Sequence, residues 1–102
     1  MLEVDIFVPL KTPKGKRPSN KKTTALKKRL LRQFGGVTFF PQSNEGLWKL
    51  GNYVYRDKIV IFRVLAAPGQ RTRKFFRGLK KELELEWDQE NVLILSRWIK
   101  FF

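Results

Sequence analysis

Apolar and polar residues alternate along several segments, as they do in β-strands that bury one face. Residues 2–10 are the clearest case, because the even-numbered side chains are all apolar, whereas Glu3 and Asp5 fall on the opposite face. Gly51 and Asn52 predict a hairpin turn further along. The other predicted strands, chosen for their β-branched and aromatic content, are residues 37–40 continued after a bulge by 45–50, then 53–67 and 91–102.

Two other segments repeat apolar residues at helical spacing. The first predicted helix begins with Thr23 or Thr24 as N-cap and stops at Gly35-Gly36, and the second covers residues 71–88. Their apolar stripes are Leu26, Leu30 and Phe34 in the first helix, and Phe76, Leu79, Leu83 and Trp87 in the second.

The predicted order is strand, helix, strand, strand, helix, strand. This order is typical of the ferredoxin-like α+β fold, a βαββαβ unit in which a four-stranded antiparallel sheet has two helices on one face. A length of 102 residues suits a single domain over residues 1–102. Residues 11–22 contain two prolines, one glycine and no periodicity, which predicts a flexible basic loop.

The face of the sheet away from the helices should be polar in a lone domain. Residues 59–65 and 92–95 are instead largely apolar on both faces, as in strands that are buried on both sides. Aliphatic side chains predominate there, and they favour packing between two copies of the sheet. The sequence therefore predicts a homodimer formed through the open sheet face.

The chain has no cysteine and no histidine. Disulfides, thiolate nucleophiles, Cys/His zinc sites and the commonest general base are thereby excluded, so no enzyme activity, metal or cofactor is predicted. No apolar run approaches the ~18 residues that span a bilayer, and the first ten residues are too short and acidic for a signal peptide. We expect a cytoplasmic protein that does not enter a membrane.

The formal charge of +13 is concentrated between Lys11 and Arg32, where ten basic residues occur with no acidic one. Such a block repels itself unless a polyanion or another partner neutralises it, although a merely solubilising surface is also possible. A second basic group opens the predicted second helix. The candidate phosphate-binding residues are Lys11, Lys14, Lys16, Arg17, Lys21, Lys22, Lys27, Lys28, Arg32, Arg71, Arg73, Lys74 and Arg77.

The second predicted helix is basic in its first half and acidic in its second, which is opposite to the order that the helix dipole favours. Ion pairs from Lys80 or Lys81 to Glu84 would reduce the cost. Alternatively, the helix N-terminus and its arginines would hold a phosphate. The pattern leaves both interpretations open.

Several motifs resemble a family of small uncharacterised bacterial proteins of about this length. The matching motifs are VDIFVPL at 4–10, FGGVT at 34–38, EGLWK at 45–49, RDKIVIF at 56–62 and ENVLI at 90–94. The resemblance implies one compact α+β domain and no particular activity. Ile6-Phe7-Val8-Pro9 is also similar to the first-strand signature of the RNA recognition motif, but residues 58–64 lack the glycine and paired aromatics of its third strand.

Three functions remain open. The first is a non-enzymatic protein that contacts nucleic acid phosphates, DNA or RNA, and the second is a dimeric assembly module for an acidic protein partner. The third is a metal-dependent nuclease, although Asp5, Glu45 and Asp57 are scattered along the chain. Trp48, Tyr53 and Tyr55 flank the hairpin turn and are predicted to pack across the hairpin, with stacking on bases as the alternative.

Overall fold

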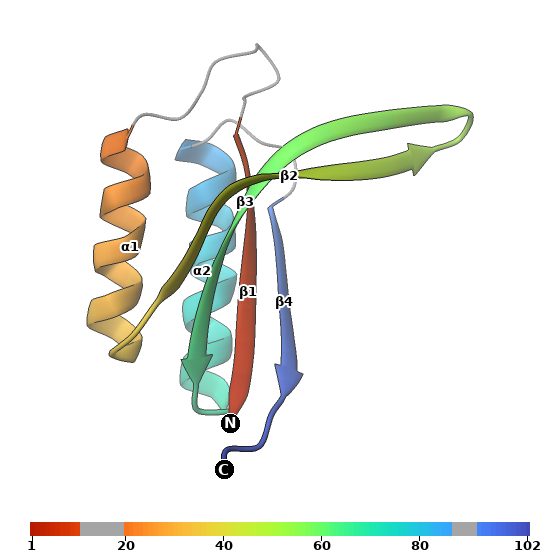
Figure 1. Ribbon diagram of the computed structural model, residues 1–102. Coiled ribbons are helices and arrows are strands. Elements are labelled where there is room, and N and C mark those ends of the chain that lie inside the picture. The colour runs from red at the N-terminus through yellow and green to blue at the C-terminus, as the bar shows by residue number, and fades with distance from the viewer. Residues whose placement is uncertain (11–19, 87–91) are drawn as a thin grey trace.

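The computed structural model describes residues 1–10, 20–86 and 92–102 and has the predicted ferredoxin-like α+β architecture (Figure 1). The predicted order of strands and helices is confirmed in full. The elements are β1 (Leu2–Pro9), α1 (Asn20–Phe34), β2 (Thr38–Leu50), β3 (Tyr53–Ala66), α2 (Gln70–Glu86) and β4 (Leu93–Trp98).

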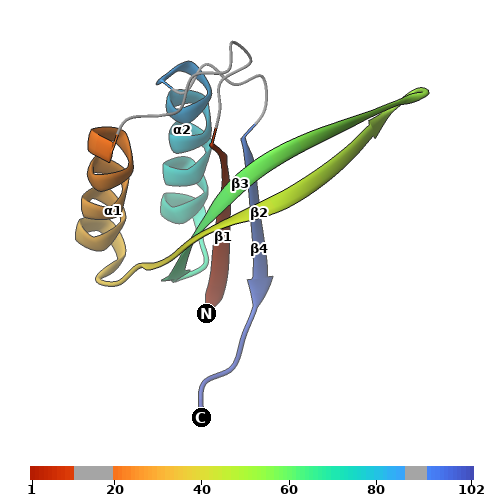
Figure 2. The same cartoon turned by 45° about the horizontal axis from the view of Figure 1, so that its top comes forward.

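The four strands form one antiparallel sheet in the order β2-β3-β1-β4. Both helices lie on one face of this sheet, and the other face is left open (Figures 1 and 2). The register of the central pair runs from Leu2 opposite Ala66 to Pro9 opposite Ile59. Alternation along β1 and β3 therefore assigns each side chain either to the helix face or to the open face.

The core lies between the helix face of the sheet and the two helices. Ile6 and Phe62 on the central strands and Leu30 and Leu79 on the helices are completely buried. Phe39 from β2 packs against the Phe62 ring at 4.7 Å between centroids. The predicted apolar stripes of both helices thus face the sheet; only Trp87 lies outside the described residues.

The acidic second half of α2 is neutralised partly by α1. Arg29 forms an ion pair with Glu82, and the Lys22 ammonium donates to the Glu86 carbonyl. These contacts join the two helices, so the unfavourable charge order along α2 has a tertiary explanation.

The last turns of α2 also hold the start of β4. Lys80 pairs with Glu84 at 2.9 Å, which confirms one of the two ion pairs expected within this helix; no Lys81–Glu84 pair forms. Glu84 also accepts a hydrogen bond from the Val92 amide at 3.0 Å, and Lys80 donates to the Val92 carbonyl at 2.8 Å. The pair therefore links α2 to the strand that follows it.

Two predicted boundaries are wrong. Helix α1 begins at Asn20, several residues before the expected N-cap at Thr23 or Thr24, so Lys21 and Lys22 are helical. A lysine is a good helix former, and the contact from Lys22 to α2 stabilises this extra turn. Strand β4 ends at Trp98 because Trp98 pairs with Leu2, the first residue of β1, and beyond it the Ile99 amide donates to the Met1 carbonyl at 3.1 Å. Most of the predicted flexible loop, residues 11–19, lies outside the described residues.

The β2–β3 hairpin extends well past the body of the domain (Figures 1 and 2). We call its projecting part, residues 45–58, the hairpin arm. The predicted turn is confirmed, since Leu50 pairs with Tyr53 and Gly51 adopts φ 60°, a left-handed conformation that suits glycine. The predicted bulge in β2 is also present, as a register shift between Phe40 and Asn44.

Candidate functional site

Four charged side chains meet on the open face of the sheet. On β1, Glu3 lies opposite Arg97 of β4, and Asp5 lies opposite Arg63 of β3. Residues opposite one another on antiparallel strands project from the same face, so the register alone brings these charges together. We call Glu3, Asp5, Arg63 and Arg97 the charged cluster.

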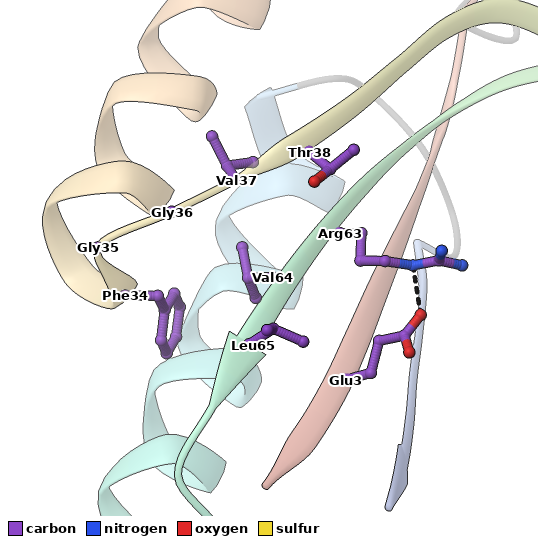
Figure 3. Close-up of a pocket in the computed structure, with 9 residues that line it drawn as sticks. All are labelled: Glu3, Phe34, Gly35, Gly36, Val37, Thr38, Arg63, Val64 and Leu65. Carbon is purple, nitrogen blue, oxygen red and sulfur yellow. Dashed lines mark ion pairs between the residues drawn. The ribbon is translucent and has the colours of Figure 1, made fainter. Parts of the chain in front are cut away.

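Arg63 is the centre of the charged cluster. Its Nε lies 2.8 Å from Asp5 Oδ1 and its Nη2 lies 3.0 Å from Asp5 Oδ2, a bidentate arrangement. The same Nε is 2.5 Å from Glu3 Oε1 (Figure 3). Arg97 Nη2 is 2.7 Å from that oxygen. Asp5 is the only charged residue among the described ones that is buried, with 9% of its surface exposed. The two acids and two guanidinium groups form a neutral network.

The network shifts the pKa values of three of its members, Glu3, Arg63 and Arg97. The hydrogen bond from Arg97, helped by the charge of Arg63, lowers the pKa of Glu3. The hydrogen bond to Asp5 raises the pKa of Arg63, and the hydrogen bond to Glu3 raises the pKa of Arg97. All of these groups therefore stay charged at neutral pH.

A surface groove of about 580 Å³ lies directly beside this cluster. Strand β2 begins at Thr38, opposite Arg63, so the last residues of β3 have no β2 neighbour beyond that point. The turn from α1 to β2, in which Gly35 adopts φ 79°, passes around the resulting gap. The groove is lined by Glu3, Phe34, Gly35, Gly36, Val37, Thr38, Arg63, Val64 and Leu65 (Figure 3).

The groove has two chemically different walls. Phe34 and Val37 offer apolar surface, and the Phe34 ring is held by a stack on Phe76 at 5.3 Å between centroids. Glu3 and Arg63 offer one negative and one positive charge. Such a site suits a small molecule that combines an apolar ring with charged groups of both signs.

Metal binding has less support in the described part of the chain. Residues 1–10, 20–86 and 92–102 contain no group of three or more His, Cys, Asp or Glu side chains placed to hold an ion. The two neighbouring carboxylates, Glu3 and Asp5, are each bound by guanidinium groups. No helix among the described residues is long and apolar enough to cross a membrane.

The predicted phosphate-binding residues do not form this site. Lys11, Lys14, Lys16 and Arg17 lie outside the described residues, and none of the others lines the groove. Lys27 lies 4.1 Å from the Phe39 ring centroid, where its ammonium is engaged by the aromatic face. The remaining predicted phosphate-binding residues lie exposed on the two helices; they are Lys21, Lys22, Lys28, Arg32, Arg71, Arg73, Lys74 and Arg77.

Sequence reasoning missed Glu3, Arg63 and Arg97 as site residues. A signal was present, because alternation placed Glu3 and Asp5 on one face and Arg63 interrupts an otherwise apolar strand. The signal could not be used without the register, which brings together Glu3 and Arg97, two residues separated by 94 positions.

Comparison with known proteins identifies the fold and not a family. No protein-family model matches the sequence, and no curated protein does. A phage SAM lyase bound to S-methyl-5'-thioadenosine aligns with a TM-score of 0.65 at 15% identity, over 94% of this chain and 79% of the lyase. The divalent cation tolerance protein CutA1 from Thermus thermophilus aligns with a TM-score of 0.65 at 18% identity, over 100% of this chain and 87% of CutA1. A phage SAM lyase in the apo state aligns with a TM-score of 0.63 at 17% identity, over 94% of this chain and 78% of the lyase.

These comparisons overturn the functional predictions. The fold occurs in a lyase, so the conclusion that a chain without cysteine and histidine is not an enzyme was wrong. The similar proteins are named for a small-molecule reaction and for cation tolerance, which contradicts the assignment as a nucleic-acid-binding protein and does not favour an assembly module or a nuclease. Clustered positive charge misled the prediction because it describes a surface and not a site.

Proposed function

We propose that this chain binds a zwitterionic small molecule in the groove beside Glu3 and Arg63, and that its first candidate substrate is S-adenosylmethionine (SAM). The observation behind this proposal is the pairing of opposite charges at the edge of an apolar groove. A ligand carboxylate would bind the Arg63 guanidinium, and a ligand ammonium would bind the Glu3 carboxylate.

The charged cluster can release the Glu3–Arg63 contact without leaving either group alone. Arg63 keeps its bidentate contact with Asp5, and Glu3 keeps Arg97. The cost of exchanging one partner for a ligand group is therefore smaller than the cost of exposing a lone buried charge. The Phe34 and Val37 wall is available to an aromatic or sugar ring.

The structural similarity to the phage SAM lyase supports the choice of candidate. That lyase holds S-methyl-5'-thioadenosine, which has a ring system and a thioether and no amino-acid group. SAM adds a methionine carboxylate and ammonium to such a nucleoside. Those are the two charges that the groove of this chain could accept.

Titration calorimetry tests the binding step. The purified protein is titrated separately with SAM, S-methyl-5'-thioadenosine and methionine. We expect SAM to bind and Arg63→Gln to weaken its binding at least tenfold. Arg56→Gln is the matched control, because Arg56 lies on the hairpin arm and makes no ion pair with a described residue. The affinity of this variant for SAM should equal that of the unmodified protein. No binding of SAM at millimolar concentration would overturn the proposal.

Chromatography tests the reaction. The protein is incubated with SAM, and the appearance of S-methyl-5'-thioadenosine above the spontaneous rate is measured. Turnover that Glu3→Gln lowers at least tenfold would support catalysis at the groove. Binding without turnover would restrict the function to a binding protein.

We also propose that copies of the chain associate through the open sheet face. This face has apolar side chains from all four strands around the charged cluster, and Leu95 is 49% exposed. The apolar residues are Phe7, Phe40, Ile61, Leu65, Leu93 and Leu95. Light scattering at micromolar protein should report a dimer or a larger oligomer, which Leu95→Lys should dissociate. A monomer at all concentrations would contradict the association.

Three finer statements stay predictions. They are membership of the bacterial family suggested by the FGGVT, EGLWK and RDKIVIF motifs, a cytoplasmic location, and a phosphate-binding role for the basic residues of the helices.

A further inference from the structure

The hairpin arm has two different faces. On one face Trp48 lies opposite Tyr55, and Leu50 lies opposite Tyr53. The two tyrosine rings are 6.3 Å apart between centroids, and Gly46 leaves space for the Trp48 ring, whose nitrogen would be 3.3 Å from any Cβ there. We call Trp48, Leu50, Tyr53 and Tyr55 the aromatic face of the arm.

The other face of the arm is mainly charged, with Lys49, Arg56 and Lys58 against a single acid, Glu45, and we call it the basic face. Lys49 lies opposite Val54, and Leu47 lies opposite Arg56, so each apolar residue is next to a positive charge. Alternation along both strands produces this separation, which resembles the pattern of a sheet with one buried and one solvated face. The structure of the arm therefore specifies which side should be covered.

The aromatic face continues the open face of the sheet. The odd-numbered residues of β3 project to one side, from Arg63 and Ile61 in the body to Tyr55 and Tyr53 in the arm. The even-numbered residues, such as Phe62, project into the core beneath the helices. One strand thus connects the two apolar surfaces without a change of side.

Nothing in residues 1–10, 20–86 and 92–102 covers the aromatic face of the arm. The arm projects away from both helices and from the rest of the sheet (Figures 1 and 2). Tyr53 is 73% exposed and Leu50 is 70% exposed. An isolated two-stranded hairpin is at best marginally stable in water, so this arm requires a partner surface.

We infer that the arm docks through its aromatic face on the open sheet face of a second copy of this chain. The six strand residues 45–50 extend about 20 Å at about 3.3 Å per residue, which is enough to reach across a neighbouring body when two open faces meet. This inference rests on the proposed association through the open face and adds the element that reaches the neighbour.

The area of the surface favours a second copy as the partner. The four side chains of the aromatic face expose roughly 500 Å², taking about 200 Å² for each fully exposed large side chain. If two copies exchange their arms and their open faces also meet, the buried surface reaches the roughly 800 Å² per partner that a stable interface needs. The same chain also supplies a matching apolar surface at Ile61, Leu93 and Leu95.

Equilibrium sedimentation of two matched double variants tests the inference. Trp48→Ser with Tyr55→Ser changes the aromatic face, and Leu47→Ser with Val54→Ser changes the basic face to a similar degree. We expect the first variant to raise the dissociation constant at least tenfold and the second to change it less than threefold. Circular dichroism checks that both variants keep the fold. Equal effects, or an unmodified protein that is monomeric, would overturn the inference.

The absence of cysteine allows a direct test of the contact. Purified Tyr53→Cys and Leu95→Cys proteins are mixed and treated with a short bismaleimide, so that a link between the two variants can form only between copies. Linked chains identified by mass spectrometry should be several times more abundant than those from Tyr53→Cys mixed with Gly78→Cys, whose new thiol lies on the exposed side of α2. Equal yields would refute docking on the open face.

The outcomes separate this inference from the proposals on which it depends. If Leu95→Lys dissociates the oligomer and the aromatic-face variant does not, the open-face association stands and the docking of the arm is wrong. Calorimetry with SAM tests the groove separately, since none of these variants changes a residue that lines it.

Discussion

The contact between Asp5 and Arg63 provides the sharpest test of the structure. Arg63→Met keeps a long apolar side chain that can still lie over the Phe40 ring, 5.0 Å from the guanidinium in the structure. It removes the bidentate partner of Asp5, which is a buried carboxylate. Asp5→Asn removes the charge from the other side and keeps the shape. The two changes and their combination form a double-mutant cycle.

The expected magnitude follows from burial. A fully buried ion pair that loses one partner costs about 3–5 kcal/mol, whereas an exposed pair contributes about 0–1 kcal/mol. The side chain of Arg63 is 33% exposed and that of Asp5 is 12% exposed, so the pair lies between these limits. We expect each single variant to lose about 1–2 kcal/mol of unfolding free energy, and the coupling energy to be about 1–2 kcal/mol.

Urea unfolding followed by tryptophan fluorescence measures the cycle. All four proteins are compared at one concentration, because association makes the apparent stability depend on concentration. The double variant should lose less stability than the two single losses added together. Additive losses, within about 0.5 kcal/mol, would mean that Asp5 and Arg63 do not stabilise one another and would refute the expected coupling.

Three further predictions concern the core, pH and the glycines. Phe62→Ala should destabilise the fold by about 3–5 kcal/mol in the same assay, since Phe62 is completely buried; a loss below about 1 kcal/mol would contradict its central place. The pKa of Glu3 is lowered in the folded state, so its contribution to stability is present above its ordinary value of 4.5 and is lost as pH falls below it. Glu3→Gln should therefore flatten the pH dependence of the melting temperature as the pH falls below about 4.5, and an unchanged slope would contradict this. Gly78→Ala should stabilise α2 by about 0.5–1 kcal/mol because its Cβ meets open space, whereas Gly51→Ala should destabilise the turn, where φ is 60°; thermal melts of both variants should move in opposite directions.

Local patterns predicted the elements because each pattern depends on neighbours in the sequence. Alternation in residues 2–10 and the apolar repeat of Leu26, Leu30 and Phe34 identified β1 and α1 with small errors at the ends. The beginning of α1 was misplaced because a contact from Lys22 to α2 stabilises an additional turn. That contact joins residues separated by 64 positions, and no local pattern contains it.

The function was predicted poorly for a related reason. Composition showed a strongly basic chain, and the basic segment attracted the functional interpretation. The groove, however, is formed because β2 begins opposite Arg63, before β3 ends at Ala66. Its walls therefore come from β1, α1, the α1–β2 turn, the start of β2 and β3. The absence of histidine and cysteine excluded particular chemistries, yet it did not exclude catalysis by other groups.

The sequence by itself determined the order of the elements, the side of β1 on which Glu3 and Asp5 lie, and the apolar character of both sheet faces, because strand and helix periodicities act over a few residues. Only the tertiary structure decided that Arg63 and Arg97 neutralise those acids and that a groove opens beside them. It also decided that the aromatic residues of the hairpin project beyond the body of the domain (Figures 1 and 2). The physical reason is that register, strand ends and the course of the hairpin are set by contacts between distant segments, and the free energy of those contacts depends on how all the elements pack together.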